Sequence, residues 1–372
     1  MSLSVGIVGL PNVGKSTLFN ALTKKQQAAA ENYPFCTIEP NSAIVEVSDS
    51  RLENLAKIVS PQQIIRATVE FTDIAGLVKG ASKGEGLGNK FLANIRECDA
   101  ILHVVRCFEN DDIIHVQEGG NKSAPIDPVG DAEVIETELV LADMEQLQKR
   151  YDKVSKEAKA KPAVRPESEA CAALLKHLEE GNPVRSFPRK EGDAIIQVIK
   201  ELHFLTEKKV IYCANVSDDN VTGEGNRHVE ALKAYADKNG SEMVIVSAQM
   251  EADLAGLSDE EAKEFLNSYG LEESSLDRTI KLAYHTLGLA SYFTAGPKEV
   301  RAWTFHRGWK APKCAGVIHT DFEKGFIRAE VIAYEDYVKH NGVAGSRAAG
   351  ALRPEGKEYE MKDGDVVEFL FN

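Results

Sequence analysis

Short runs of apolar, β-branched residues alternate with longer segments of helical periodicity through most of the chain. The apolar runs, each of strand length, lie at 4–9, 68–73, 100–105, 209–214 and 243–247. In the segments between them, such as 88–97 and 227–239, apolar residues recur every three or four positions. Buried strands that alternate with helices are typical of a parallel sheet with helices on both faces. We therefore predict an α/β domain.

Two segments depart from this alternation. Between about residue 131 and residue 204 no run is a convincing strand, and two long helical patterns are separated by a turn with Pro162 and Pro166. From about residue 286, aromatic and β-branched residues stand among glycines, which is typical of a small α+β module. The expected parts are an α/β domain from 1–130 and 205–285, an inserted helical hairpin or coiled coil at 131–204, and a C-terminal module at 286–372.

Composition and charge limit the classes of partner and the cellular compartments that the sequence allows. Of the 372 residues 43% are hydrophobic and 27% charged, and 44 Lys and Arg against 58 Asp and Glu give a formal net charge of −14. A net negative protein repels the phosphate backbone, which argues against a nucleic-acid-binding protein that relies on its overall charge, although an acidic protein can carry a local basic face. No apolar run is long enough for a membrane helix, the N-terminus lacks the features of a signal peptide, and the six cysteines include no CxxC pair. We expect a cytoplasmic monomer with no membrane partner.

The strongest motif is GLPNVGKS at residues 9–16, which matches the phosphate-loop pattern GxxxxGK[ST]. It stands between a predicted strand and a predicted helix, where glycines let the backbone wrap a phosphate and the helix N-terminus points N–H groups at it. Lys15 is expected to reach the β- and γ-phosphates as a catalytic residue, and Ser16 to ligate Mg²⁺. The expected nucleotide-binding residues of this loop are Asn12, Val13, Gly14, Lys15, Ser16 and Thr17.

A second motif, DIAG at residues 73–76, ends the strand predicted at 68–73. Downstream of a phosphate loop, such a DxxG turn holds Mg²⁺ through its Asp and meets the γ-phosphate through the Gly N–H. We therefore assign Asp73 to the metal and Gly76 to catalysis. Thr37 stands where a switch loop would complete the Mg²⁺ shell, so that the expected metal ligands are Ser16, Thr37 and Asp73.

A third motif, NVSD at residues 215–218, follows the strand predicted at 209–214. Guanine-specific proteins carry NKxD here, in which the Asp binds guanine and the Lys stem covers the base. Asn215 and Asp218 keep that spacing, but Val216 replaces the Lys. Ser247 and Ala248, after the next strand, match a loop that supports the base. These two residues and Asn215, Val216 and Asp218 are nucleotide-binding candidates; the alternative for the Asn and Asp is that they cap a helix.

Together these motifs resemble those of the YchF/Obg-like ATPase family. The match runs essentially end to end and includes GLPNVGKST at 9–17, YPFCTIEPN at 33–41, DIAGLVKG at 73–80, GASKGEGLGNKFL at 80–92 and the unusual NVSD. The resemblance implies a P-loop NTPase with a Ras-like G domain, the helical insertion, and a C-terminal β-grasp module similar to the TGS domain of threonyl-tRNA synthetases. It also implies association with the ribosome and a preference for ATP over GTP. Asp218 departs from the Glu that is common in the family, so a GTPase of the same fold is an alternative.

The residue that activates water is not the usual one. Ras-like enzymes carry a Gln directly after DxxG, and this chain has Leu77, whose side chain forms no hydrogen bond. We therefore expect slow hydrolysis, and the resemblance implies that His115 positions or deprotonates the water. Asn12 matches an asparagine of potassium-activated relatives, which implies K⁺ as a second ion. Leu77 also favours another alternative, a nucleotide-gated adaptor whose hydrolysis is incidental.

Two basic clusters are candidate surfaces for ribosomal RNA. The helical insertion carries Lys149, Arg150, Lys153, Lys156, Lys159, Lys161 and Arg165. The C-terminal module carries Arg301, His306, Arg307, Lys310 and Lys313, with Trp303 and Trp309 among them. A positive face attracts phosphates and aromatic rings can stack on bases, although a solvated helix tip and a packed core explain the same residues.

Overall fold

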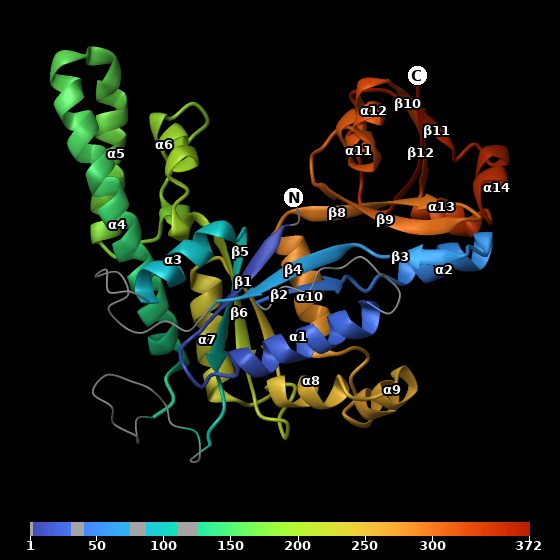
Figure 1. The fold of residues 1–372 in the computed structure, drawn as a ribbon, viewed down its shortest axis with the longest axis horizontal. Helices are drawn as coiled ribbons and strands as arrows, with labels where there is room; N and C mark the ends of the chain where they lie inside the picture. The colour runs from blue at the N-terminus through green and yellow to red at the C-terminus, as the bar shows by residue number, and fades with distance from the viewer. Residues whose placement is uncertain (1–2, 31–40, 75–86, 111–112, 114–124) are drawn as a thin grey trace. The chain divides into compact units, whose positions relative to one another are not determined.

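The computed structural model of the chain describes residues 3–30, 41–74, 87–110, 113 and 125–372 (Figure 1). The chain divides into two compact units, Met1–Ile44 with Glu70–Arg278 and Val45–Val69 with Thr279–Asn372. Each unit is organised around a six-stranded sheet. Among the residues described, none of the helices combines the length and the apolar character that crossing a membrane requires.

The sheet of the first unit has the strand order β2-β4-β1-β5-β6-β7. Its strands are β1 (Ser4–Val8), β2 (Ser42–Glu46), β4 (Thr68–Asp73), β5 (Ala100–Arg106), β6 (Lys209–Asn215) and β7 (Glu242–Val246). β1 pairs in parallel with β4 and β5, and β5, β6 and β7 continue in parallel. All seven residues of β5 are buried, as expected for a central strand that is covered on both faces. The predicted α/β fold is confirmed, with β2 as a strand that the sequence analysis did not predict.

The helices that connect strands of this sheet include α1 (Lys15–Ala30), α3 (Leu87–Glu97) and α7 (Arg227–Lys238). α8 (Ala248–Leu254), α9 (Asp259–Ser268) and α10 (Ser275–Thr286) follow β7, and α10 continues from the first unit into the second. α1 contacts both β1 and α8. α7 begins where the Asn226 side chain accepts hydrogen bonds from the N–H groups of His228 and Val229, and its buried Leu232 shares an apolar cluster with Tyr212 of β6.

The predicted helical insertion is present and contains a third helix. α4 (Pro128–Ala160) and α5 (Arg165–Glu179) run side by side in Figure 1, joined by a 3₁₀ turn at Pro162–Val164. α6 (Ala194–Leu202) adds Ile195, Val198 and Ile199 to their shared apolar core. The fully buried Asp143 of α4 accepts hydrogen bonds from the N–H of Leu205 (2.9 Å) and from the N–H and hydroxyl of Thr206 (2.8 and 2.7 Å). These bonds hold the returning chain against α4 just before β6 begins.

The second unit contains a mixed sheet with the order β11-β10-β12-β8-β9-β3. Its strands are β3 (Gln63–Ile65), β8 (Leu289–Ala295), β9 (Glu299–His306), β10 (Phe326–Ala333), β11 (Arg353–Glu355) and β12 (Asp365–Phe371). Its helices are α2 (Ser50–Val59), α11 (Ala311–Ile318), α12 (Thr320–Lys324), α13 (Tyr334–Lys339) and α14 (Val343–Ala348). One face of the sheet packs Tyr292, Phe305, Val331 and Phe369 against Cys314 and Ala315 of α11. This agrees with the expected α+β module.

A segment from the N-terminal half completes the second sheet. β3 pairs in parallel with β9, with Ile64 opposite Val300. α2 joins it, because the Asn54 amide donates to the Tyr334 hydroxyl (2.9 Å) and the Arg51 guanidinium lies 4.8 Å from the centre of the Phe293 ring. The predicted domains placed 45–69 with the first domain, whereas these contacts group it with the C-terminal part of the chain.

Candidate functional site

The loop between β1 and α1 depends on two glycines that lie against other parts of the chain. Gly14 has a φ of +99°, and a Cβ there would lie 2.3 Å from the Asn215 Nδ2. A Cβ on Gly9 would lie 2.5 Å from the carbonyl oxygen of Val104 in β5. No other residue fits either position without moving the backbone, so the loop keeps its tight wrapped shape.

A cavity of about 530 Å³ opens beside this loop. The residues that line it follow four strands: 12 and 14–17 after β1, 108–110 and 113 after β5, 215–218 at the end of β6, and 248–249 after β7. The carboxyl ends of parallel strands are the usual ligand-binding edge of an open α/β sheet. Of the predicted nucleotide-binding residues, the cavity brings together Asn12, Gly14, Lys15, Ser16, Thr17, Asn215, Val216, Asp218 and Ala248.

Lys15 and Asp73 influence each other electrostatically across the end of the sheet. Burial lowers the pKa of Lys15, and the Asp73 carboxylate opposes that shift. Burial likewise raises the pKa of Asp73, opposed by the Lys15 ammonium. Asp73 is the last residue of β4 and pairs with Ile7 of β1, so it reaches the edge of the sheet from which the phosphate loop starts.

The donor set at this edge fits Mg²⁺. The Ser16 hydroxyl and the Asp73 carboxylate are hard oxygen ligands, and Mg²⁺ usually takes only one or two protein groups beside water and substrate phosphates. The described residues contain no group of three or more His, Cys, Asp or Glu side chains arranged to hold a metal ion by themselves. An ion shared with the phosphates of a bound nucleotide agrees with both observations.

Asn215 links the two ends of the cavity. Its buried amide donates to the carbonyl of Val13 (2.8 Å), and its Oδ1 accepts from the N–H of Ala248 (3.0 Å). The side chain thus connects the phosphate loop to the start of α8. Val13 contributes this carbonyl rather than a cavity wall, and Ser247 is buried and caps α8 by accepting from the Met250 N–H (3.3 Å).

Val216 and Asp218 differ in exposure although both line the cavity. Val216 is buried, and its N–H donates to the carbonyl of Val246 (2.8 Å), whereas Asp218 is exposed. A buried aliphatic side chain therefore occupies the position of the Lys that covers guanine in NKxD proteins. The Val216 side chain packs in an apolar cluster with Val105 and Val229, so it presents no cation to the cavity, while Asp218 keeps a carboxylate at the rim.

One wall of the cavity was missed by the sequence analysis. Phe108, Glu109, Asn110 and Ile113 follow β5 and face the cavity. The nearly fully buried Arg106 holds this segment, because its guanidinium donates to the carbonyls of Phe108 (3.0 Å), Asn110 (2.9 Å) and Ile113 (3.0 Å). The guanidinium also lies 4.8 Å from the centre of the Phe108 ring. The available signal was an Arg at the end of a strand whose other residues, apart from His103, are apolar, next to the strand that starts the phosphate loop.

Glu109 connects this wall to α7. Its carboxylate accepts from His228 Nε2 (2.8 Å) and from the Arg227 guanidinium (3.2 Å). The hydrogen bond from His228 lowers the pKa of Glu109; burial opposes this shift, and the hydrogen bond from Arg227 adds to it. The rim of the cavity therefore carries an ionised carboxylate at neutral pH.

Four of the residues singled out in the sequence lie outside the described part of the chain. They are Thr37, Gly76, Leu77 and His115. Their expected roles in metal binding and hydrolysis stay predictions.

Comparison with family models gives two matches. Residues 4–159 match a model described as "50S ribosome-binding GTPase". Residues 289–372 match the YchF-type GTPase C-terminal model, described as "Protein of unknown function (DUF933)". The first match covers the phosphate loop and much of α4, and the second covers the C-terminal module.

Full-length relatives agree with these matches. The chain is 53% identical to the "Ribosome-binding ATPase YchF" of Bacillus subtilis, over 100% of both chains. It is 52% identical to the protein of the same name from Escherichia coli O157:H7, again over 100% of both chains. The solved structure of the Schizosaccharomyces pombe YchF GTPase superposes with a TM-score of 0.88 at 37% identity, covering 99% of this chain and 98% of that one. From its phosphate loop to its C-terminal module, the chain belongs to the YchF family.

Proposed function

We propose that the protein is a ribosome-associated nucleotide switch that binds ATP with Mg²⁺ and hydrolyses it slowly to ADP and phosphate. The observation that supports this most directly is the cavity at the carboxyl edge of the first sheet. It joins a phosphate loop to a base-side wall in which Val216 replaces the guanine-covering Lys. The YchF relatives at 52–53% identity carry the name ribosome-binding ATPase, which supports the same function.

In this proposal the loop at 9–17 binds the phosphates. Asn12 and residues 14–17 line the cavity, and α1 begins at Lys15, so the N-terminus of this helix favours an anion there. Lys15 places its ammonium against the β- and γ-phosphate oxygens. Ser16 and Asp73, with Thr37, would hold Mg²⁺, which neutralises phosphate charge when bound. Asn12 would contribute to a K⁺ site beside the same phosphates.

We propose that the base lies between Phe108 and Val216. Phe108 faces the cavity from the segment held by Arg106, and Val216 lies on the β6 side. Two apolar walls accept either purine, so preference for one base depends on the polar groups around them. Without a Lys at position 216 the chain lacks a contact that favours guanine, which supports ATP. Asp218 at the rim supports GTP as the alternative nucleotide.

The proposed hydrolysis requires a group that orients water, because Leu77 cannot. We propose His115 for this role and Gly76 for binding the γ-phosphate through its N–H. A nucleotide-gated adaptor is the second candidate function. The substitution His115→Ala separates the two. If the protein is an ATPase, this variant should release phosphate about 10²-fold or more slowly than the parent, with ATP affinity unchanged, both measured in Mg²⁺ and K⁺. Unchanged release would favour the adaptor.

We propose that the tip of the helical insertion contacts ribosomal RNA. The exposed cations of this tip are Lys153, Lys156, Lys159, Lys161 and Arg165. The neighbouring Lys149 and Arg150 are already paired, with Glu145 (2.6 Å) and Glu167 (2.6 Å) respectively. The five cations of the tip form no ion pair with the part of the chain that the structure describes, and such surface cations on an acidic protein form a local positive region that attracts phosphate.

The basic residues of the C-terminal module support an RNA contact less well. Arg301 lies 3.8 Å from the centre of the Trp303 ring and Lys313 lies 3.9 Å from that of Trp309. Both indoles also pack against the apolar core of the module. Their faces are thus partly occupied, so we favour the helical insertion as the RNA-binding surface of a cytoplasmic monomer.

A further inference from the structure

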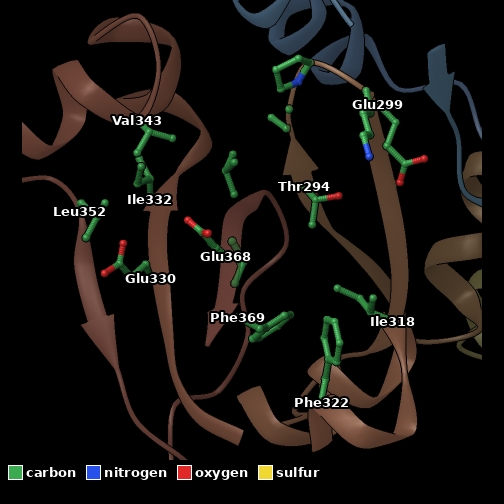
Figure 2. Close-up of a pocket in the computed structure, with 16 residues that line it drawn as sticks. Thr294, Glu299, Ile318, Phe322, Glu330, Ile332, Val343, Leu352, Glu368 and Phe369 are labelled. Atoms are coloured by element: carbon green, nitrogen blue, oxygen red, sulfur yellow. The ribbon is translucent and has the colours of Figure 1, made fainter. Parts of the chain in front are cut away.

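The second unit contains a groove of about 670 Å³ that the proposed ATPase does not use (Figure 2). Its walls come from the turn between β8 and β9, from β10 and β12, from α11 and α12, and from α14 with the segment that follows it. All of these elements belong to the C-terminal part of the chain. The groove is therefore a feature of one unit.

The groove lies where β8 ends beside the middle of β12. β12 pairs with β10 along its whole length, from Asp365 opposite Ala333 to Phe371 opposite Phe326. Its parallel pairing with β8 consists of one residue pair, Val366 with Phe293. β8 stops two residues later, and the chain turns into β9, with the Gly296 N–H bonded to the Glu299 carbonyl (3.0 Å). The rest of β12 has no strand partner on this side within the described part of the chain.

Side chains from both faces of the sheet line this one groove. Glu368 and Phe369 are adjacent in β12, so they point to opposite faces, and both reach it. Figure 2 shows Ile318 and Phe322 on the side of Phe369, and Glu330 and Ile332 on the side of Glu368. A groove that is lined from both faces, next to an unpaired strand edge, has the form of a place for one more strand.

The two sides of the groove differ in chemistry. The side of Phe369 is apolar, with Ile318 and Phe322 beside it. On the other side, the Glu330 carboxylate is paired with Arg347 (3.0 Å). Glu368 is exposed and takes part in no ion pair among the described residues. Lys298 and Glu299 of the turn between β8 and β9 line the groove as well, one cation and one carboxylate. An occupant thus meets an apolar surface on one side and, on the other, the Glu368 carboxylate, which forms no ion pair among the described residues.

We propose that the groove binds an extended segment of a partner protein, in which Lys or Arg alternates with apolar residues, as an added strand beside β12. Hydrogen bonds to the free edge of β12 supply affinity that does not depend on sequence. Because side chains of a strand alternate between faces, every second residue meets Phe369 and Phe322 and the others meet Glu368. The carboxylate repels nucleic-acid phosphates, so the charge of the groove favours a basic peptide over RNA.

The test uses the full-length protein and a fluorescein-labelled peptide, acetyl-Val-Lys-Val-Lys-Val-Lys-Val-amide, with binding measured by fluorescence anisotropy. The substitution Glu368→Lys reverses the charge in the groove. Glu335→Lys makes the same change at an exposed position of α13 that does not line it. We expect Glu368→Lys to weaken peptide binding about tenfold or more and Glu335→Lys to leave it within about twofold. Equal losses in the two variants, or no binding of the peptide at millimolar concentration, would contradict the proposal.

Two further probes separate strand addition from simple charge attraction. A peptide of the same sequence with N-methyl groups at alternate residues keeps its charges but cannot form the main-chain bonds. We expect it to bind about tenfold more weakly, and binding to slow amide hydrogen exchange at residues 367–371. Equal binding of the N-methylated peptide would exclude an added strand. If single-stranded oligoadenylate displaces the peptide, and Glu368→Lys binds this RNA more tightly than the parent does, the groove would be assigned to RNA instead.

Discussion

The first unit contains the cavity beside the phosphate loop and the second contains the groove beside β12, and different features of the chain determine which ligand each one favours. The cavity in the first unit lies at the carboxyl ends of parallel strands, where backbone N–H groups, a helix N-terminus and Lys15 favour an anion. The groove in the second unit lies beside an unpaired strand edge, where apolar side chains and Glu368 favour an extended cationic chain. Backbone geometry determines the ligand of the first, and side chains together with a missing strand pairing determine that of the second.

Removing the charge of Lys15 is expected to have the largest effect on this contrast. Lys15→Ala deletes the cation that, in the proposed complex, contacts the β- and γ-phosphates, and charged hydrogen bonds contribute about 1.5–3 kcal/mol each. ATP affinity in Mg²⁺ should fall about a hundredfold, measured by calorimetry, while peptide binding to the groove stays unchanged. Lys24→Ala, an exposed position of the same helix, is the matched control. An ATP affinity of Lys15→Ala within twofold of the parent would contradict the proposal that this cavity binds ATP.

Arg106 tests whether the wall after β5 is part of the nucleotide site. Arg106→Met leaves the carbonyls of Phe108, Asn110 and Ile113 without their donor, so this wall should lose its fixed position. We expect ATP affinity to fall about thirtyfold, equivalent to about 2 kcal/mol, with the affinity for inorganic tripolyphosphate unchanged. The control is Arg96→Met, which removes the hydrogen bond from the exposed Arg96 guanidinium to the Gln146 side chain. Equal losses for ATP and tripolyphosphate would show that Arg106 acts through general stability.

Val216→Lys sharpens the base side of the comparison. It restores the NKxD pattern while keeping Asn215 and Asp218. Because Val216 is buried in an apolar cluster, the Lys ammonium is expected to leave that cluster for the cavity that residue 216 lines. The ratio of GTP to ATP affinity should rise about tenfold, measured by paired titrations with both nucleotides. Val216→Leu keeps the position aliphatic and should leave the ratio unchanged. A rise of the ratio in Val216→Leu as well would indicate that packing, rather than the Lys, sets the preference.

Glu109 gives the smallest effect and depends on pH. The hydrogen bond from His228 lowers its pKa in the folded chain, so this interaction adds stability above the unfolded value of about 4.3. That contribution is lost as the pH falls through the lower folded value. Glu109→Gln should therefore melt about 1 °C below the parent at pH 7, and the gap should close on acidification below about pH 4. A gap that widens in acid would contradict the assigned direction.

Much of the first unit could be predicted because its signals are local. Five of its strands and its phosphate loop coincide with apolar runs and a motif in the sequence. β2 and β3 were not predicted. β2 is as long as β1 and β7 but is buried only at alternate residues, so it lacks their continuous apolar run, and β3 exists through its pairing with β9, far away in the chain. The third helix of the insertion was likewise absent from the prediction, since Ala194–Leu202 lies in a segment with several turns.

The residues that line the cavity of the first unit were predicted where a motif marks them and missed where long-range contacts position them. Asn215, Val216 and Asp218 reach the cavity as their spacing indicated. The segment from Phe108 to Ile113 carries no motif, and its contribution depends on three backbone carbonyls held by a buried Arg106. The groove beside β12 was not predictable either, because the place where β8 ends relative to β12 is a property of strand register.

The most direct test of the account is a calorimetric titration of the nucleotide-free protein with non-hydrolysable ATP and GTP analogues in Mg²⁺, with K⁺ or Na⁺. We expect the ATP analogue to bind about tenfold more tightly, a gap of about 1.4 kcal/mol, because Val216 removes the contact that favours guanine. Equal or tighter binding of the GTP analogue would mean that Asp218 still recognises guanine, and it would contradict the proposed ATPase.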